Sequence, residues 1–272
     1  MSPKRLHPGL LLGLAGAVAW VLPFAWMAVA SLRPADATDM ASLWPSGGIT
    51  LANYREAWGA GDFPLWYLNT ILLCGGLFVV QIVTSSLAGY AFARLRFRGS
   101  SWLFYAFLLQ LMLPPVVLLV PNLQTIATLG LYDHLAGIAA PYAASAFGVF
   151  LMRQTFRAIP RDFEDAARID GAGVLDTIRH VLLPLARPGI AAFAIVSVAS
   201  HWNEFLWPLI ATSSPSEQVL TVGLASFTTA GEAGAQWGLI AAGTAMVAAP
   251  LLVGFALAQR HFVSALTASG LK

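Results

Sequence analysis

LWYLNTILLCGGLFVVQIVTSSLAGYAFA, residues 65–93, contains no Asp, Glu, Lys or Arg. A helix needs roughly 20 apolar residues to cross about 30 Å of hydrocarbon, and this stretch is longer than that. We therefore predict a helix here that crosses a membrane.

The composition of the whole chain also indicates a membrane protein. Hydrophobic residues make up 58% of the 272 positions and charged residues 10%, whereas soluble domains carry about 25% charged residues. Too few charges are present to wet the surface of a soluble globule. The single cysteine, Cys74, lies in an apolar run, and a metal site needs several ligands. We therefore predict no disulfide within the chain, no metal site and no cofactor.

Six segments are long and apolar enough to span a membrane. They are residues 10–32, 65–93, 99–132, 135–152, 188–211 and 233–259. The third is interrupted by Pro114, Pro115 and Pro121, so only part of it needs to cross. The fold class that follows is an all-α integral membrane protein with six transmembrane helices, and residues 1–272 are expected to form a single membrane domain.

The basic residues indicate the orientation of these spans, because cytoplasmic loops carry an excess of Lys and Arg. If the N-terminus is cytoplasmic, all of the 15 Lys and Arg residues except Arg33 and Arg55 fall on the cytoplasmic side. We therefore predict a multi-pass protein of the cell (inner) membrane with both termini in the cytoplasm.

The longest charged stretch, RQTFRAIPRDFEDAARIDGAGVLDTIRHVLLPLARPG, spans residues 153–189 between the fourth and fifth predicted spans. Asp162 predicts the N-cap of a helix, with another acid three residues later as in a capping box. Glycine commonly ends helices, so this helix is expected to end at Gly171. A second short helix is expected over residues 174–183, before Pro184. The pattern alone fits an ordinary solvated helix as well as a docking helix.

Within this stretch, Asp165-Ala166-Ala167, then Gly171, then VLLP at residues 181–184 resemble the EAA motif of ABC importer permeases, EAA-x3-G-x9-I-x-L-P. Asp165 stands where Glu is usual, although Glu164 precedes it, and Val181 stands where Ile is usual. Four further stretches are similar to the carbohydrate-uptake branch, in particular to the maltose-type permease with six spans. They are LAGYAFAR at residues 87–94, MLPP at 112–115, WNEFLWPL at 202–209 and QRHF at 259–262.

The resemblance implies a transporter core at residues 65–260 with a cytoplasmic coupling segment at 160–184. In the family, the coupling helix of this segment docks into a cleft of a separate ATPase subunit. Glu164 and Asp165 would face basic residues of the ATPase, the two alanines would form the closely packed surface, and Gly171 would make the turn. The residues implied in coupling are Phe163, Glu164, Asp165, Ala166, Ala167, Asp170 and Gly171.

The resemblance also implies partners and a class of solute. The partners would be a second homologous permease subunit, a dimer of ATP-binding subunits, an extracytoplasmic solute-binding protein and the lipid bilayer, with no nucleic acid. The solute would be a carbohydrate or a related polyol or glycerophosphodiester. The chain would form half of the translocation pathway.

The chain lacks a phosphate-binding loop of the kind that hydrolyses ATP. No stretch matches G-x4-G-K-[ST], and the only lysines are Lys4 and Lys272. That loop needs its Lys beside backbone amides to hold the phosphates. We therefore expect a non-catalytic permease subunit, with ATP hydrolysis in a partner.

Glu204 is an acid within a predicted span, where ionisable groups are costly and usually functional. One interpretation places it in the substrate pathway, and another has it stabilise the bundle near the outer interface. Two other classes of protein stay open: a proton-coupled secondary transporter that uses Glu204, and a membrane enzyme built on His201 and Glu204. The candidate pathway residues are Trp202, Asn203, Glu204 and Trp207.

The predicted orientation can be tested with single cysteines in a Cys74→Ala background. A cysteine at Ser216 is expected to react with an impermeant thiol reagent applied to intact cells, and one at Ser100 is not. Labelling of the Ser100 variant in intact cells would show that the number of spans is wrong.

Overall fold

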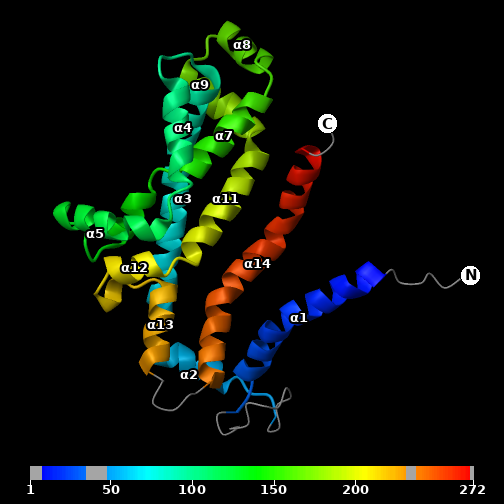
Figure 1. Cartoon of the computed structure of the whole chain (residues 1–272), viewed down its shortest axis with the longest axis vertical. Helices are drawn as coiled ribbons and strands as arrows, with labels where there is room; N and C mark the ends of the chain where they lie inside the picture. Colours follow the sequence, from blue (N-terminus) through cyan, green and yellow to red (C-terminus); the bar gives the residue numbers. More distant parts are fainter. Residues whose placement is uncertain (1–7, 35–47, 231–236, 270–272) are drawn as a thin grey trace, which may run out of the picture. The chain divides into compact units, whose positions relative to one another are not determined.

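The computed structural model describes residues 8–34, 48–230 and 237–269, and every regular element in these residues is a helix (Figure 1). Three single helices are long and apolar enough to cross a membrane: α1 (Pro8–Ser31), α3 (Phe63–Arg94) and α14 (Trp237–Ser269). Three bent helix pairs pass the same test, which gives up to 6 spans in the described residues if each pair counts as one. The predicted all-α membrane fold is confirmed, and its six spans fit this count.

The first bent pair consists of α4 (Ser100–Gln110), η1 (Pro115–Leu118) and α5 (Leu119–Thr128). Its two halves meet at 100° (Figure 1). Pro114 and Pro115 lie at the break, and proline has no backbone N–H with which to continue a helix. The predicted interruption of residues 99–132 at these prolines is confirmed, because the helix ends at Gln110 and the chain turns before η1.

The second bent pair, with an angle of 49°, consists of α6 (Leu135–Ala139), η2 (Ala140–Tyr142) and α7 (Ala146–Ala158). The third, with an angle of 80°, consists of α9 (Val174–Thr177), η3 (Ile178–Leu182), α10 (Leu183–Leu185) and α11 (Arg187–Trp202). The predicted stop at Pro184 is wrong. η3 is a π-helix and the helical path continues to Leu185, because proline is tolerated at the start of a helical segment.

The predicted span over residues 188–211 is also interrupted. α11 ends at Trp202, residues 203–205 are not helical, and α12 (Leu206–Ala211) follows. The chain then forms η4 (Pro215–Glu217) and α13 (Leu220–Ala230). Pro208 lies inside the short α12. Hydropathy alone does not separate α11 from α12, because both are apolar.

The carboxylate of Asp133, between α5 and α6, holds the loop that follows α12. Its Oδ1 accepts hydrogen bonds from the backbone N–H groups of Ser213 and Ser214, both at 2.8 Å. Its Oδ2 accepts one from the Ser214 hydroxyl at 2.5 Å. Asp133 has a φ of 61°, a left-handed conformation that Asp adopts more readily than most residues.

The described chain divides into two compact units. One consists of the residues up to Phe63 together with Gly223–Pro250, and the other of Pro64–Val222 together with the residues from Leu251 onward. In the first unit, α2 (Ala52–Ala60) is fastened to the end of α1. The side-chain amide of Asn53 donates to the carbonyls of Ser31 (2.9 Å) and Arg33 (2.6 Å). The Ser31 carbonyl is one of those that the end of α1 leaves open.

Two apolar clusters hold the second unit together. One gathers α3, α5, α6 and α12 around the buried residues Leu73, Leu77, Ile126, Ile138, Trp207 and Ala211. The other joins α3, α7 and the π-helix through Tyr90, Met152, Phe156, Ile178, Leu182 and Ala186. The second cluster therefore anchors the segment that follows α8 (Asp162–Ile169) to two membrane helices.

Glycines allow two of these helices to approach closely. A Cβ on Gly89 of α3 would lie 2.8 Å from Cβ of Met152 and 3.0 Å from the backbone N of Arg153 in α7. Gly75, in the same helix, has nothing within 4 Å of such a Cβ. The α3–α7 contact therefore requires glycine at position 89 and not at position 75.

Gly89→Ala is expected to lower the thermal unfolding midpoint of the detergent-solubilised protein, because overpacking costs roughly 1–3 kcal/mol. Gly75→Ala, the control, is expected to leave the midpoint unchanged or raise it, since Ala favours helices. Equal midpoints for the two variants would contradict the close packing at Gly89.

Candidate functional site

α8 is an exposed amphipathic helix at the end of the second unit where α7 stops (Figure 1). Its first turn carries Asp162, Glu164 and Asp165, and negative charge is favourable there because of the helix dipole. The predicted cap is wrong: Arg161 occupies the N-cap position, no side chain caps the helix, and Asp162 is its first residue.

The end of α8 follows the sequence prediction. Gly171 has a φ of 84°. Its N–H donates to the Arg168 carbonyl at 3.0 Å, and the Ala172 N–H donates to the Ala167 carbonyl at 2.9 Å. These two bonds make a Schellman motif, which needs a left-handed residue after the helix. Gly171 therefore sets the direction in which the chain leaves α8.

Glu164 does not face outward, and the expectation that it meets a basic residue of another protein is corrected. Its side chain is 2% exposed, and its Oε1 lies 2.5 Å from Nε of Arg94 at the end of α3. Arg94 also donates from Nη2 to the Ile159 carbonyl at 2.7 Å. A buried carboxylate requires an opposite charge, and the chain supplies that charge itself.

The outward face of α8 is formed by other residues. Phe163 is 49% exposed and Ile169 87%, although Ile169 was not among the predicted residues. Asp165 is exposed and pairs with Arg168 at 2.9 Å, an arrangement that contributes about 0–1 kcal/mol. Ala166 and Asp170 are exposed and Ala167 is half-buried. We call Phe163, Asp165, Ala166, Ala167, Ile169 and Asp170 the α8 surface.

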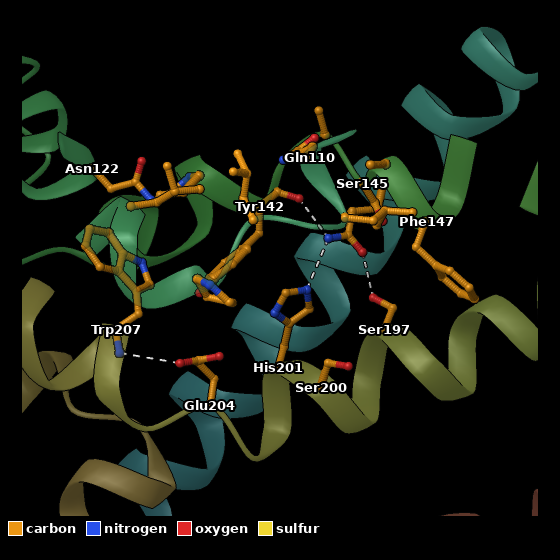
Figure 2. A pocket seen from close by; sticks show the side chains of 18 of the residues that line it. Gln110, Asn122, Tyr142, Ser145, Phe147, Ser197, Ser200, His201, Glu204 and Trp207 are labelled. Atoms are coloured by element: carbon orange, nitrogen blue, oxygen red, sulfur yellow. Dashed lines mark hydrogen bonds between the residues drawn. The ribbon is translucent and has the colours of Figure 1, made fainter. Parts of the chain in front are cut away.

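A cavity of about 480 Å³ lies in the second unit, among the breaks in the helices (Figure 2). Its lining residues come from α3, α11, α5 and α12 and from the α4–η1 and η2–α7 breaks. Tyr142, Phe147 and Trp207 add aromatic rings to the lining. The polar side chains of the lining include Gln81, Gln110, Asn122, Ser200, His201 and Glu204.

The side chain of Gln81, 3% exposed, joins three elements at this cavity. Its Nε2 lies 2.7 Å from the Tyr142 carbonyl and 3.1 Å from Nε2 of His201, and its Oε1 accepts from the Ser197 hydroxyl at 2.7 Å (Figure 2). The rings of Tyr142 and His201 lie 4.8 Å apart. Gln81 therefore fixes the His201 ring and the backbone of Tyr142.

Two of the four predicted pathway residues line the cavity. Glu204 is half-buried there, and its Oε1 accepts from the Trp207 N–H at 3.4 Å (Figure 2). Trp207 is 1% exposed and donates from Nε1 to the Ile138 carbonyl at 3.1 Å. Trp202 is buried and Asn203 is exposed, and neither is among the lining residues.

The charge on this lining is one-sided. Among the lining residues, all of which the structure describes, Glu204 is the only acid and none is Lys or Arg. The described part of the chain also holds no group of three or more His, Cys, Asp or Glu side chains that could bind a metal ion. The arrangement suits hydrogen bonding to a polar molecule.

Sequence reasoning missed Gln81, Tyr142 and Ser197. The available signal was a polar side chain inside a charge-free apolar run, since polar groups within spans tend to be functional. Nothing in the sequence showed that the run around Gln81 faces the break after Tyr142, because those residues are far apart in the chain.

Comparison with known proteins gives consistent results. Residues 81–266 match the family model described as "binding-protein-dependent transport system inner membrane component". The chain is 31% identical to the arabinooligosaccharides transport system permease protein AraQ of Halalkalibacterium halodurans, covering 93% of this chain and 91% of the relative. It is 33% identical to the trehalose transport system permease protein SugB of Mycobacterium tuberculosis (93% and 92%). It is 34% identical to the sn-glycerol-3-phosphate transport system permease protein UgpE of Yersinia pestis (80% and 79%).

Solved structures share the fold. A chain of a bacterial ABC transporter involved in the import of the acidic polysaccharide alginate superposes with a TM-score of 0.82 and 23% identity, covering 96% of this chain and 100% of that one. A bacterial alginate ABC transporter in complex with an alginate pentasaccharide-bound periplasmic protein gives a TM-score of 0.65 at 15% identity, covering 92% of both chains. Because the family model matches more than half of this chain, the chain belongs to the inner membrane components of binding-protein-dependent transport systems.

Proposed function

We propose that this chain is the permease subunit of an ATP-driven ABC importer for a carbohydrate or a related polyol or glycerophosphodiester. The observation that carries the proposal is the α8 surface, an exposed apolar and acidic helix face outside the spans of a chain in this family. The relatives named above are transport permeases for solutes of these classes. The subunit forms half of the translocation pathway, and the cavity around Glu204 and Trp207 belongs to that pathway.

The chain is not the enzyme of the complex, because it has no G-x4-G-K-[ST] loop. Its partners are a second homologous permease subunit, a dimer of ATP-binding subunits, an extracytoplasmic solute-binding protein and the lipid bilayer. A related fold has been solved with a periplasmic protein bound. Both termini lie in the cytoplasm, a proposal supported by the distribution of Lys and Arg along the sequence.

Coupling takes place through residues 160–184, within a transporter core at residues 65–260. The α8 surface docks into the ATPase, with Phe163, Ala166 and Ala167 as its packed part and Asp165 and Asp170 as its acidic part. Glu164 acts from the inner side of the helix, where its contact with Arg94 connects α8 to α3. Gly171 aims the helix, and the cluster around Ile178 and Leu182 connects the following segment to α3 and α7.

Gly171→Val is expected to abolish solute-stimulated ATP hydrolysis and transport in the assembled complex while the protein still inserts. Left-handed geometry costs a residue with a Cβ roughly 1–2 kcal/mol, and the change redirects α8. Gly173→Val is the matched control, because Gly173 has a φ of −74° and a Cβ there makes only an ordinary contact at 3.5 Å with Asp176. Coupled transport at the parental rate in Gly171→Val would contradict the coupling role of α8.

Substitutions that remove the negative charge of Glu164 or reverse that of Asp165 are expected to have different effects. Glu164→Gln leaves Arg94 buried without its partner, and breaking a buried ion pair costs about 3–5 kcal/mol, so its thermal midpoint is expected to fall. Asp165→Lys is expected to keep the parental midpoint and to weaken retention of the ATPase in a pull-down. Parental midpoints for both variants would contradict the inward role of Glu164, and parental ATPase retention by Asp165→Lys would remove Asp165 from the docking surface.

A further inference from the structure

We propose that the cavity around His201 and Glu204 binds an uncharged polyhydroxylated solute and excludes phosphorylated or carboxylated ones. This inference rests on the proposed function and narrows its classes of solute to the uncharged carbohydrates and polyols, without the glycerophosphodiesters. The volume of the cavity, about 480 Å³, falls within the range of about 300–1,000 Å³ that is usual for small-molecule sites.

The first argument is electrostatic. Glu204 lines the cavity and no Lys or Arg does so among its described lining residues. A phosphate or carboxylate would lose its hydration there without gaining a cation and would lie close to the Glu204 carboxylate. Like charges brought together in this way reject a ligand. Proteins that recognise phosphate or carboxylate generally supply Arg or Lys.

The second argument comes from the hydrogen bonds of Gln81. The Tyr142 carbonyl can only accept, so the side-chain atom 2.7 Å from it must be the Gln81 nitrogen. The same nitrogen lies 3.1 Å from Nε2 of His201, which must therefore accept as well. A histidine that accepts at Nε2 is neutral and carries its proton on Nδ1. Gln81 thus holds His201 uncharged, with its Nδ1–H as a fixed donor.

This donor faces the cavity. In Figure 2 the second ring nitrogen of His201 points away from the bond to Gln81, on the side of Glu204. The site therefore offers a fixed donor and a strong acceptor a few residues apart on one side of the cavity. A hydroxyl group can both accept from His201 and donate to Glu204, which a phosphate or carboxylate oxygen cannot do when ionised.

The remaining lining fits the rest of a sugar or polyol. Gln110 and Asn122 supply amides, Ser200 supplies a hydroxyl, and Tyr142 and Trp207 supply aromatic rings. Such rings are apolar on their faces and cover C–H groups, while amides and hydroxyls serve further hydroxyls. The relatives named above include one for sn-glycerol-3-phosphate, an anion, and one for trehalose, an uncharged sugar. The lining of the cavity favours an uncharged solute, as in the trehalose relative.

The first experiment compares charge classes in the whole transporter. The complete complex with its binding protein is reconstituted in vesicles, and ATP-driven uptake is measured for trehalose and arabinotriose and for sn-glycerol-3-phosphate and an alginate oligosaccharide. We expect uptake to be confined to uncharged probes. ATP-driven uptake of either anion would overturn the inference. If no probe of either class were taken up, the proposed function would fail together with it.

The second experiment locates the solute. In a Cys74→Ala background, a cysteine at Ser200 is expected to react with a small maleimide at least about tenfold more slowly in the presence of a probe that the complex imports, since the probe would occupy the cavity. A cysteine at Ser216, which does not line the cavity, is the control. Import without protection at Ser200 would overturn the inference and leave the proposed function intact.

The third experiment separates the two nitrogens of His201. The amide nitrogen of Asn occupies the place of Nδ1, and that of Gln occupies the place of Nε2. His201→Gln is therefore expected to raise KM for the imported probe about fivefold or more above that of His201→Asn, as loss of a solute hydrogen bond would. Glu204→Gln is expected to reduce the discrimination against anionic probes. The reverse order for the two His201 variants, or unchanged discrimination in Glu204→Gln, would overturn the inference.

Discussion

A buried ion pair between Arg94 and Glu164 joins the end of α3 to the inner side of α8. Burial of two charges is costly, and their attraction offsets the cost only when the partners remain together. The pair therefore resists any motion that would separate α8 from α3. In the proposed coupling, a force applied to the exposed side of α8, at Phe163 or Ile169, would reach α3 through this ion pair. The exposed face of α8 does not determine where the helix lies. The contact between Glu164 and Arg94 fixes the position of α8 relative to α3.

The breaks in the helices and the cavity have one origin. A bent helix leaves backbone carbonyls without their usual partners, and a membrane interior offers no water to satisfy them. Here side chains take that place: Gln81 donates to the Tyr142 carbonyl, and the indole of Trp207 donates to that of Ile138. The same side chains line the cavity or hold its lining in place. The polar groups that make the bends tolerable therefore also create a place for a polar molecule, and neither feature could be removed without the other.

Sequence predicted some of these features well and others poorly, for physical reasons. Apolar length predicted the spans, because the thickness of the bilayer acts on each segment separately, and Gly171 predicted the end of α8, because a Schellman motif is local. Local pattern failed where partners lie far apart in the chain. The sequence predicts Glu164 to be an outward acid beside Asp165, whereas its partner, Arg94, comes from a helix much earlier in the chain. Likewise, hydropathy predicted that the fifth span continues past Asn203, although α11 ends at Trp202.

The contacts of Asp133 have a consequence for acid tolerance. Three donors from Ser213 and Ser214 stabilise its ionised form, with the Ser214 hydroxyl first among them, and lower its pKa from 3.8 to about 2. Because the pKa is lowered on folding, the stabilisation is fully present above about pH 4 and is lost only as the pH falls through about 2. The connection between the loop before α6 and the loop after α12 therefore survives an acidic medium that would protonate an ordinary carboxylate. At about pH 3, where an ordinary aspartate is mostly protonated, Asp133 stays mostly ionised and keeps its three hydrogen bonds.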